Sequence, residues 1–147
     1  MDSVDIRSTI NGLRLLGIRI KKKKGGVFYV YGSAISGFKK FTGVINCGNS
    51  GTSIRCLLGL LTCYPYPVTL TGDASLRKRP FQRLTNFLEH VGAVITYPKN
   101  SKTTLPIKIH GTHDWALAQK HYLKVPSAQI ASALIYILAP SRPKRQT

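Results

Sequence analysis

An internal repeat is the feature that most limits the folds open to this chain of 147 residues. The segment Leu13–Ile18 parallels Leu88–Ala93, and each is followed by an extended run, a polar turn, a second extended run and a glycine. The segment Ser50–Leu58 likewise parallels Ser127–Ile135. Each unit is interpreted as helix, strand, strand, strand, helix, and it buries its apolar face against a neighbour. The pattern predicts an α/β fold of about two such units.

Local signals divide the first unit into elements. A helix begins at Asp2 and Ser3, and Gly17 is a natural stop for it. Strands at 18–20 and 27–31 flank a turn rich in lysine and glycine, which we expect to be a solvated hairpin tip. The predicted apolar face of the helix is Ile6, Ile10, Leu13 and Leu16.

The rest of the chain continues the alternation. Pro80 suits the first position of a helix, because its missing N–H has no partner there anyway. Further extended runs are expected at 38–45, 68–71, 93–97, 106–110 and 122–125, and helices at about 50–62, 80–91 and 126–139.

A glycine-containing turn at Asn46–Arg55 stands out between a strand and an apolar helix. Gly48 and Gly51 let the backbone turn sharply and expose its N–H groups. Small polar side chains follow at the helix start, where unpaired N–H groups and the helix dipole favour anions. An ordinary capped helix has the same local pattern. The repeat, however, places an equivalent helix start at Ser127, and two converging helix starts are more specific than one.

Composition favours an anionic partner. The apolar share of 43% is sufficient for a packed core. The formal net charge of +17 comes from 22 basic and only five acidic residues. Such a charge favours nucleic acid, phosphorylated metabolites or an anionic membrane surface. The few carboxylates restrict acid–base and metal chemistry.

The cysteines and the apolar runs indicate a reducing, cytoplasmic location. Three cysteines without CxxC spacing are typical of free thiols rather than of a disulfide framework or a zinc site. The N-terminus has no apolar signal region. The run Ile130–Ala139 is too short to span a membrane. His110 and His113 lack further ligands, so we expect no metal.

Three motifs carry a resemblance to a known family. Residues 46–55 resemble the glycine-turn signature of the 5-enolpyruvylshikimate-3-phosphate synthases (3-phosphoshikimate 1-carboxyvinyltransferases). Residues 70–80 resemble the second signature of that family, which closes in Arg-Pro, and Ser127–Gln129 is similar to the third. The resemblance covers nearly all of residues 2–139. The UDP-N-acetylglucosamine enolpyruvyl transferases share the architecture but differ in the second motif, and they are a lower-ranked alternative.

The resemblance implies both a fold and a reaction. The fold is the inside-out α/β barrel-like domain of enolpyruvyl transferases, with repeated helix-plus-strands units. The reaction moves the enolpyruvyl group of phosphoenolpyruvate to the 5-hydroxyl of shikimate 3-phosphate, in aromatic amino acid biosynthesis, without a cofactor. We expect residues 1–140 to be a partial, incomplete domain of this kind, and residues 141–147 to be an unrelated basic tail.

Site residues follow from the resemblance by position. Asn49, Gly51 and Thr52 would lie beside the phosphoenolpyruvate subsite, with Arg55 supporting the turn. Arg79 would clamp phosphoenolpyruvate through its planar donor fork. A methyl group at Gly51 would intrude on phosphoenolpyruvate and on glyphosate, the inhibitor of the family.

The third motif corresponds to the other substrate. Ser127 and Ala128 match the site for the phosphate of shikimate 3-phosphate, where Ala128 offers only its backbone N–H. Gln129 would contact the same substrate. For these residues and for the arginines, the plain alternative is a helix cap or a solvated side chain.

The chain also departs from the family pattern. The early Lys-Ser-…-Arg motif should precede Asp2, and a second domain should supply the catalytic carboxylates and lysine. We therefore expect no catalytic residue in this chain and no full activity of it alone; a second chain with these groups would complement it. The rival hypothesis is a basic nucleic-acid-binding module that uses Lys21–Lys24, Lys39–Lys40, Arg77–Arg79 and the tail.

Overall fold

The computed structural model of the chain describes residues 3–33, 35–97, 101, 103–112, 131–133 and 135–136. The helices and strands are, in order, α1 (Val4–Leu15), β1 (Arg19–Lys22), β2 (Phe28–Tyr31), β3 (Val44–Asn46), α2 (Gly51–Leu61), β4 (Val68–Thr71), α3 (Gln82–His90), β5 (Val94–Thr96) and β6 (Ile107–His110). Short 3-10 turns lie at η1 (Lys24–Gly26), η2 (Ile35–Gly37) and η3 (Leu76–Lys78). Residues 131–133 and 135–136 are helical.

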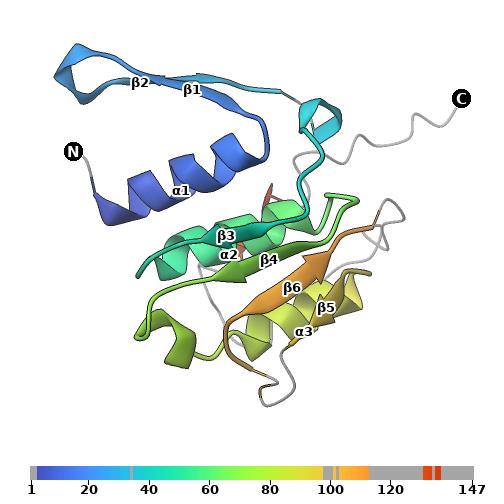
Figure 1. Ribbon diagram of the computed structural model, residues 1–147. Helices are drawn as coiled ribbons and strands as arrows, with labels where there is room; N and C mark the ends of the chain where they lie inside the picture. The colour runs from blue at the N-terminus through green and yellow to red at the C-terminus, as the bar shows by residue number, and fades with distance from the viewer. Residues whose placement is uncertain are drawn as a thin grey trace, which may run out of the picture.

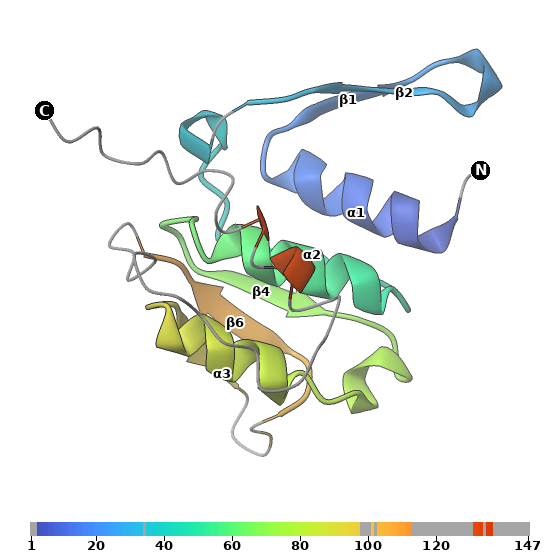
Figure 2. The ribbon, with the colours of Figure 1, turned by 180° about the vertical axis from the view of Figure 1, so that it is seen from behind.

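The elements form one mixed sheet and one separate hairpin. The sheet has the strand order β3-β4-β6-β5, with β3 and β4 parallel and the other pairs antiparallel. Helices α2 and α3 cover one face of this sheet (Figures 1 and 2). Among the described strands, β1 and β2 pair only with each other, and they lie with α1 to one side. No described helix is both long enough and apolar enough to cross a membrane.

The core lies between the sheet and its two helices. Strand residues alternate between the two faces of a sheet, so in β6 Ile107 and Ile109 are buried while Lys108 and His110 are exposed. Burial of such apolar side chains is the main force that holds the layers together. The fully buried partners from the helices are Ile54, Leu57, Leu58, Leu61 and Leu88.

The structure shows the repeat at atomic level. The Ile18 N–H donates to the Leu13 carbonyl at 3.0 Å, and the Ala93 N–H donates to the Leu88 carbonyl at 2.9 Å. Both helices thus end in the same way, through a glycine with positive φ, 92° at Gly17 and 102° at Gly92.

The hairpins that follow these helix ends have the same register. Ile20 pairs with Val30, and Ile95 pairs with Ile109. In each pair the first residue lies three positions after the helix-ending glycine, and the second lies two positions before the closing glycine. The predicted equivalence of the two units is therefore confirmed over their helix ends and hairpins.

Helix α1 is confirmed, and its predicted apolar face is confirmed in part. Leu16 is fully buried and Ile10 and Leu13 are half-buried, whereas Ile6 is exposed. Within the helix the buried positions are Ser8 and Gly12. A Cβ at Gly12 would lie only 2.9 Å from Leu57 Cδ1 of α2. Small residues face α2 because the two helices pack closely, and Thr9 Oγ1 reaches Ser53 Oγ at 2.7 Å.

Two boundaries also differ from the predictions. Helix α3 begins at Gln82 rather than at Pro80, because Phe81 has a φ of −116° and so lies outside the helical conformation. The Phe81 N–H donates to the Thr103 carbonyl at 2.7 Å. Of the extended run predicted at 38–45, only the end belongs to a strand, β3. Earlier in the run, the Phe41 N–H donates to the Tyr64 hydroxyl at 2.6 Å instead of to a neighbouring strand. The predicted strand at 122–125, the start of the helix at 126 and the tail at 141–147 lie outside the described residues.

Candidate functional site

The candidate site begins at the turn between β3 and α2. The Gly48 N–H donates to Asn46 Oδ1 at 2.9 Å, and Gly48 has a φ of 56° that favours glycine. Ser50 caps α2, accepting the Ser53 N–H on its Oγ at 3.0 Å. Gly51, the first residue of α2, is buried, and the exposed Thr52 follows it. The result is a helix N-terminus with a bare backbone, which favours an anion.

The end of β4 lies directly beside this turn. Because β3 and β4 are parallel, Asn46 pairs with Thr71 and both strands end at the same edge of the sheet (Figure 1). Two hydrogen bonds continue the pairing: the Cys47 N–H donates to the Thr71 carbonyl at 2.9 Å, and the Asp73 N–H donates to the Gly48 carbonyl at 2.8 Å.

A glycine is required at position 72, because the backbone of the turn after β3 passes very close to it. A Cβ there would lie 2.7 Å from the Gly48 carbonyl oxygen and 2.5 Å from Leu76 Cδ2. The backbone oxygen cannot move aside without disturbing the turn. Any side chain at Gly72 would therefore separate the two arms of the site.

A chain of polar contacts joins the two arms. Asn49 Nδ2 donates to Asp73 Oδ2 at 2.6 Å, and Arg79 Nη2 donates to Asn49 Oδ1 at 3.1 Å. The Leu76 N–H donates to Asp73 Oδ1 at 2.7 Å. This backbone N–H, followed by the Asn49 amide, holds the pKa of the Asp73 carboxyl below its ordinary value. Asp73 is therefore a fixed carboxylate that positions Asn49, and through it Arg79.

Two guanidinium groups flank Gly51. A Cβ built on Gly51 would lie 2.7 Å from Arg55 Nη1 and 3.5 Å from Arg79 Nη1. Arg55 also lies over the Phe81 ring, with its Cζ 5.2 Å from the ring centroid. Burial lowers the pKa of Arg55, and the nearby charge of Arg79 lowers it further. Two like charges held this close to a helix N-terminus are suited to a multiply charged anion.

The structure describes five of the residues that the sequence pointed to, and not the other three. Asn49, Gly51, Arg55 and Arg79 come together, and Thr52 lies in the first turn of the same helix. Ser127, Ala128 and Gln129 lie outside the described residues. Sequence reasoning gave neither Asp73 nor Phe81 a positioning role in the site. The spacing Asp73-x-x-Leu76, typical of a side chain that caps a turn, was the available signal for Asp73.

Other reaction types receive little support from the described residues. Burial raises the pKa of Cys47 to about 12 and that of Cys63 to about 12, so both thiols stay protonated near neutral pH. Within the described ranges, no three His, Cys, Asp or Glu side chains gather as they do in a metal site. The arrangement of the site is suited to binding and orienting an anion.

The sequence of the chain matches a known protein family. The profile of the family described as EPSP synthase (3-phosphoshikimate 1-carboxyvinyltransferase) matches residues 1–145. The chain belongs to the EPSP synthase family. It is 44% identical over 135 residues to the 3-phosphoshikimate 1-carboxyvinyltransferase of Oenococcus oeni, covering 92% of this chain and 30% of that protein. The enzyme of the same name from Alkaliphilus oremlandii is 45% identical over 134 residues, covering 90% and 30%.

Solved EPSP synthase structures share the fold. Two structures of the Acinetobacter baumannii enzyme each match with a TM-score of 0.82 and 33% identity over 93% of this chain, and they are covered to 30% and 31%. The predicted family and α/β fold class are confirmed. The chain spans about 30% of the length of these EPSP synthase relatives.

Proposed function

We propose that this chain supplies the phosphoenolpyruvate side of an EPSP synthase. The reaction moves the enolpyruvyl group of phosphoenolpyruvate to the 5-hydroxyl of shikimate 3-phosphate and releases phosphate, a step of the shikimate pathway. The observation that carries the proposal is the convergence of Arg55 and Arg79 on the N-terminus of α2 beside Gly51.

The chemistry of phosphoenolpyruvate suits this convergence. It carries a carboxylate and a phosphate, and planar guanidinium forks bind both groups well. The absence of a side chain at Gly51 keeps open the space between the two guanidinium groups, since a methyl group there would meet Arg55 Nη1. Asn49 and Asp73 fix Arg79 in advance, which lowers the entropy cost of binding.

Binding and turnover are separate matters for this chain. General acid–base catalysis needs a group that exchanges a proton within hydrogen-bond reach of the substrate. Asp73 is the carboxylate of the described site, and its lowered pKa keeps it charged. We therefore propose that the chain binds phosphoenolpyruvate and that turnover needs groups beyond these 147 residues, on the same or a complementing chain.

The shikimate 3-phosphate side belongs to the same proposal. We assign it to Ser127, Ala128 and Gln129, which the repeat places at a helix start equivalent to that of α2. Packing of the two equivalent helices supports this assignment: Ala133 is fully buried, and a Cβ at Gly59 of α2 would lie 2.9 Å from its Cα.

The boundaries and the location remain parts of the proposal. We take residues 1–140 as part of one enolpyruvyl transferase domain and residues 141–147 as a distinct basic tail. We place the protein in the cytoplasm, which the free thiols of Cys47, Cys56 and Cys63 support.

Calorimetric titration of phosphoenolpyruvate tests the proposed subsite. We expect Arg79→Gln to weaken binding about tenfold or more, since a charge-assisted hydrogen bond is lost. Lys23→Gln is the matched control, because Lys23 lies on the first hairpin against the Tyr29 ring. Equal affinities of the two variants would refute the subsite.

A phosphate-release assay with both substrates tests the second half of the proposal. We expect no turnover by the chain alone. Sustained phosphate release would show that groups within these residues carry the catalysis.

A further inference from the structure

The two arginines of the site are held in different ways. Arg79 Nη2 donates to Asn49 Oδ1 at 3.1 Å, and Asn49 in turn donates to Asp73. The Arg55 guanidinium lies over the Phe81 ring, with its Cζ 5.2 Å from the ring centroid. One arginine is thus fixed by a hydrogen bond, and the other rests on the face of an aromatic ring.

Arg55 needs an attraction that keeps it in this place, because Arg79 repels it. A Cβ built on Gly51 would lie 2.7 Å from Arg55 Nη1 and 3.5 Å from Arg79 Nη1. Burial lowers the pKa of Arg55, and the charge of Arg79 lowers it further. Without a favourable contact of its own, a long side chain in this position gains both entropy and distance from the like charge by turning toward solvent. A ring face supplies that contact, and it attracts a guanidinium more strongly where water is excluded.

Phe81 is a rigid support for this contact. Its side chain is 2% exposed and belongs to the buried core. Its N–H donates to the Thr103 carbonyl at 2.7 Å, and its carbonyl accepts the N–H groups of Leu84 and Thr85, both at 3.0 Å. These bonds fix the backbone of the residue, and core packing fixes the ring. A guanidinium that lies over the ring is therefore held in one position.

The contact also joins the two arms of the site. Arg55 lies on α2, which follows β3, whereas Phe81 lies two residues after Arg79 in the segment that follows β4. The second arm therefore carries one guanidinium itself and supports the other through its ring. The separation of the two guanidinium groups depends on this arm alone.

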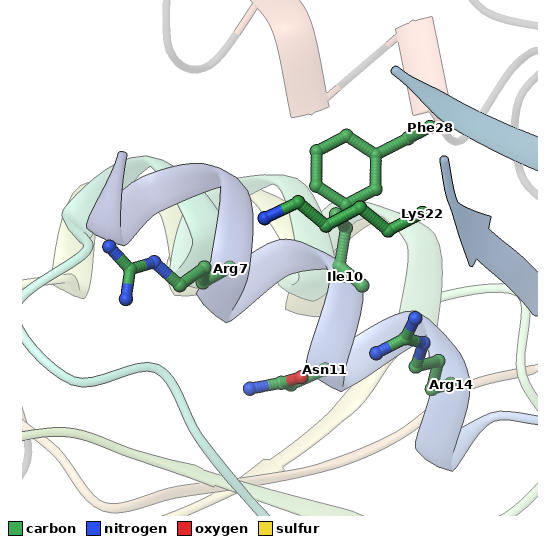
Figure 3. Close-up of a pocket in the computed structure, with 6 residues that line it drawn as sticks. All are labelled: Arg7, Ile10, Asn11, Arg14, Lys22 and Phe28. Carbon is green, nitrogen blue, oxygen red and sulfur yellow. The ribbon is translucent and has the colours of Figure 1, made fainter. Parts of the chain in front are cut away.

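A second cation lies over a ring in the hollow between α1 and the β1–β2 hairpin, and it provides a contrast (Figure 3). The hollow has a volume of about 210 Å³. In it the Lys22 Nζ lies 5.6 Å from the centroid of the half-buried Phe28 ring. Lys22 and Phe28 are paired on the two strands of one hairpin. Their contact stays within that hairpin, whereas the contact of Arg55 with Phe81 connects two separate segments.

We propose that Phe81 is a positioning residue that holds Arg55 at a fixed separation from Arg79, and that it thereby makes the site prefer an anion with two charged groups over an anion with one. This inference rests on the proposed phosphoenolpyruvate subsite and adds a residue that sets its selectivity. An anion with a single charged group gains from either guanidinium alone. An anion with a carboxylate and a phosphate gains fully only when both guanidinium groups are already in place.

Calorimetric titration of Phe81→Leu with phosphoenolpyruvate and with inorganic phosphate tests the proposal. Leucine keeps an apolar side chain in the core but offers Arg55 no aromatic face. We expect the affinity for phosphoenolpyruvate to fall about fivefold and that for phosphate to fall by less than about twofold. The ratio of the two affinities is the readout, because a partly unfolded protein loses both alike. Phe81→Tyr keeps the ring, so we expect it to retain the ratio of the unaltered chain.

Phe28→Leu is the matched control, since it removes the ring beside Lys22 and lies outside the site. We expect it to leave both affinities unchanged. Thermal unfolding first checks that Phe81→Leu is folded. If it is not, Phe81→Met, whose longer side chain adapts to an irregular space, takes its place with the same expected fall in the ratio.

Two results would overturn this inference alone. One is an unchanged ratio of affinities in Phe81→Leu, and the other is a fall in the ratio that is as large in Phe81→Tyr as in Phe81→Leu. Failure of the proposed function gives a different result, because the unaltered chain then binds phosphoenolpyruvate no more tightly than inorganic phosphate. That outcome overturns the subsite and the role of Phe81 together.

Discussion

The β1–β2 and β5–β6 hairpins have the same register but different surroundings. Strand β6 pairs with β4 on its other side, with Val68 opposite Ile109. Among the strands that the structure describes, β2 pairs with β1 alone, and its Val30 is 58% exposed. The repeat thus determines the local hairpin, while pairing with a third strand and contact with the preceding helix determine how firmly that hairpin is held.

The largest effect on stability is expected from replacing the glycine that closes each hairpin, Gly32 in the first and Gly111 in the second. A Cβ at Gly111 would collide with the carbonyl oxygens of Leu61, Thr62 and Tyr64, whereas a Cβ at Gly32 meets nothing within 4 Å. We expect Gly111→Ala to lower the free energy of unfolding by about 3 kcal/mol. We expect Gly32→Ala to change it by less than about 0.5 kcal/mol. Urea unfolding measures both, and similar losses would show that the first hairpin is packed as tightly as the second.

A smaller effect is expected from the contact that fixes the second hairpin to α3. Tyr97→Phe removes the hydroxyl that meets Thr85 Oγ1, and we expect a loss of about 1 kcal/mol. Tyr29→Phe is the control in the first hairpin, where Tyr29 is 47% exposed. Thermal unfolding compares the two variants, and a larger loss for Tyr29→Phe would reverse our ranking of the hairpins.

The smallest expected effect is the pH dependence of stability that Asp73 contributes. Asp73 follows β4, the strand that pairs with β6 of the second hairpin. Hydrogen bonds from Leu76 and Asn49 lower the folded pKa of Asp73 below its ordinary value of 3.8. As pH falls, the unfolded chain therefore takes up this proton first. The stabilisation is complete above about pH 5 and is lost as pH falls through the folded pKa.

Asp73→Asn tests this pH dependence. We expect the variant to lose less stability than the unaltered chain on acidification from about pH 5 to about pH 2, as measured by urea unfolding. Glu89→Gln controls for the loss of one carboxylate elsewhere. An acid limb that is unchanged in Asp73→Asn would contradict the assignment.

The sequence was sufficient to predict features that depend only on residues close together in the chain, such as helix ends and turns. Caps and stops such as Ser3, Gly17 and Ser50 act within one helical turn, so helix ends could be read from them. The turn at Asn46–Arg55 was predicted for the same reason. Arg79 came from the family resemblance and not from any local rule.

Contacts between distant segments escaped prediction. The close packing of α1 on α2 through Gly12 depends on Leu57, which lies 45 positions further along the chain. An apolar helical stripe gives no sign that small residues will face a neighbour instead. The bond from Asn49 to Asp73 likewise depends on the parallel pairing of β3 with β4. Hydrophobic periodicity carries no information about which strands become neighbours.

The parallel pairing of β3 and β4 has a consequence for assembly of the chain. The turn with Asn49 and the arm with Arg79 come from different strands, and they meet only when those strands are in the observed register. An anion that bridged them, as proposed for phosphoenolpyruvate, would act as a removable crosslink between these two segments. At a concentration one hundred times its dissociation constant, such a ligand adds about 2.7 kcal/mol to the stability of the native state. The proposed ligand would thus favour the correctly paired sheet.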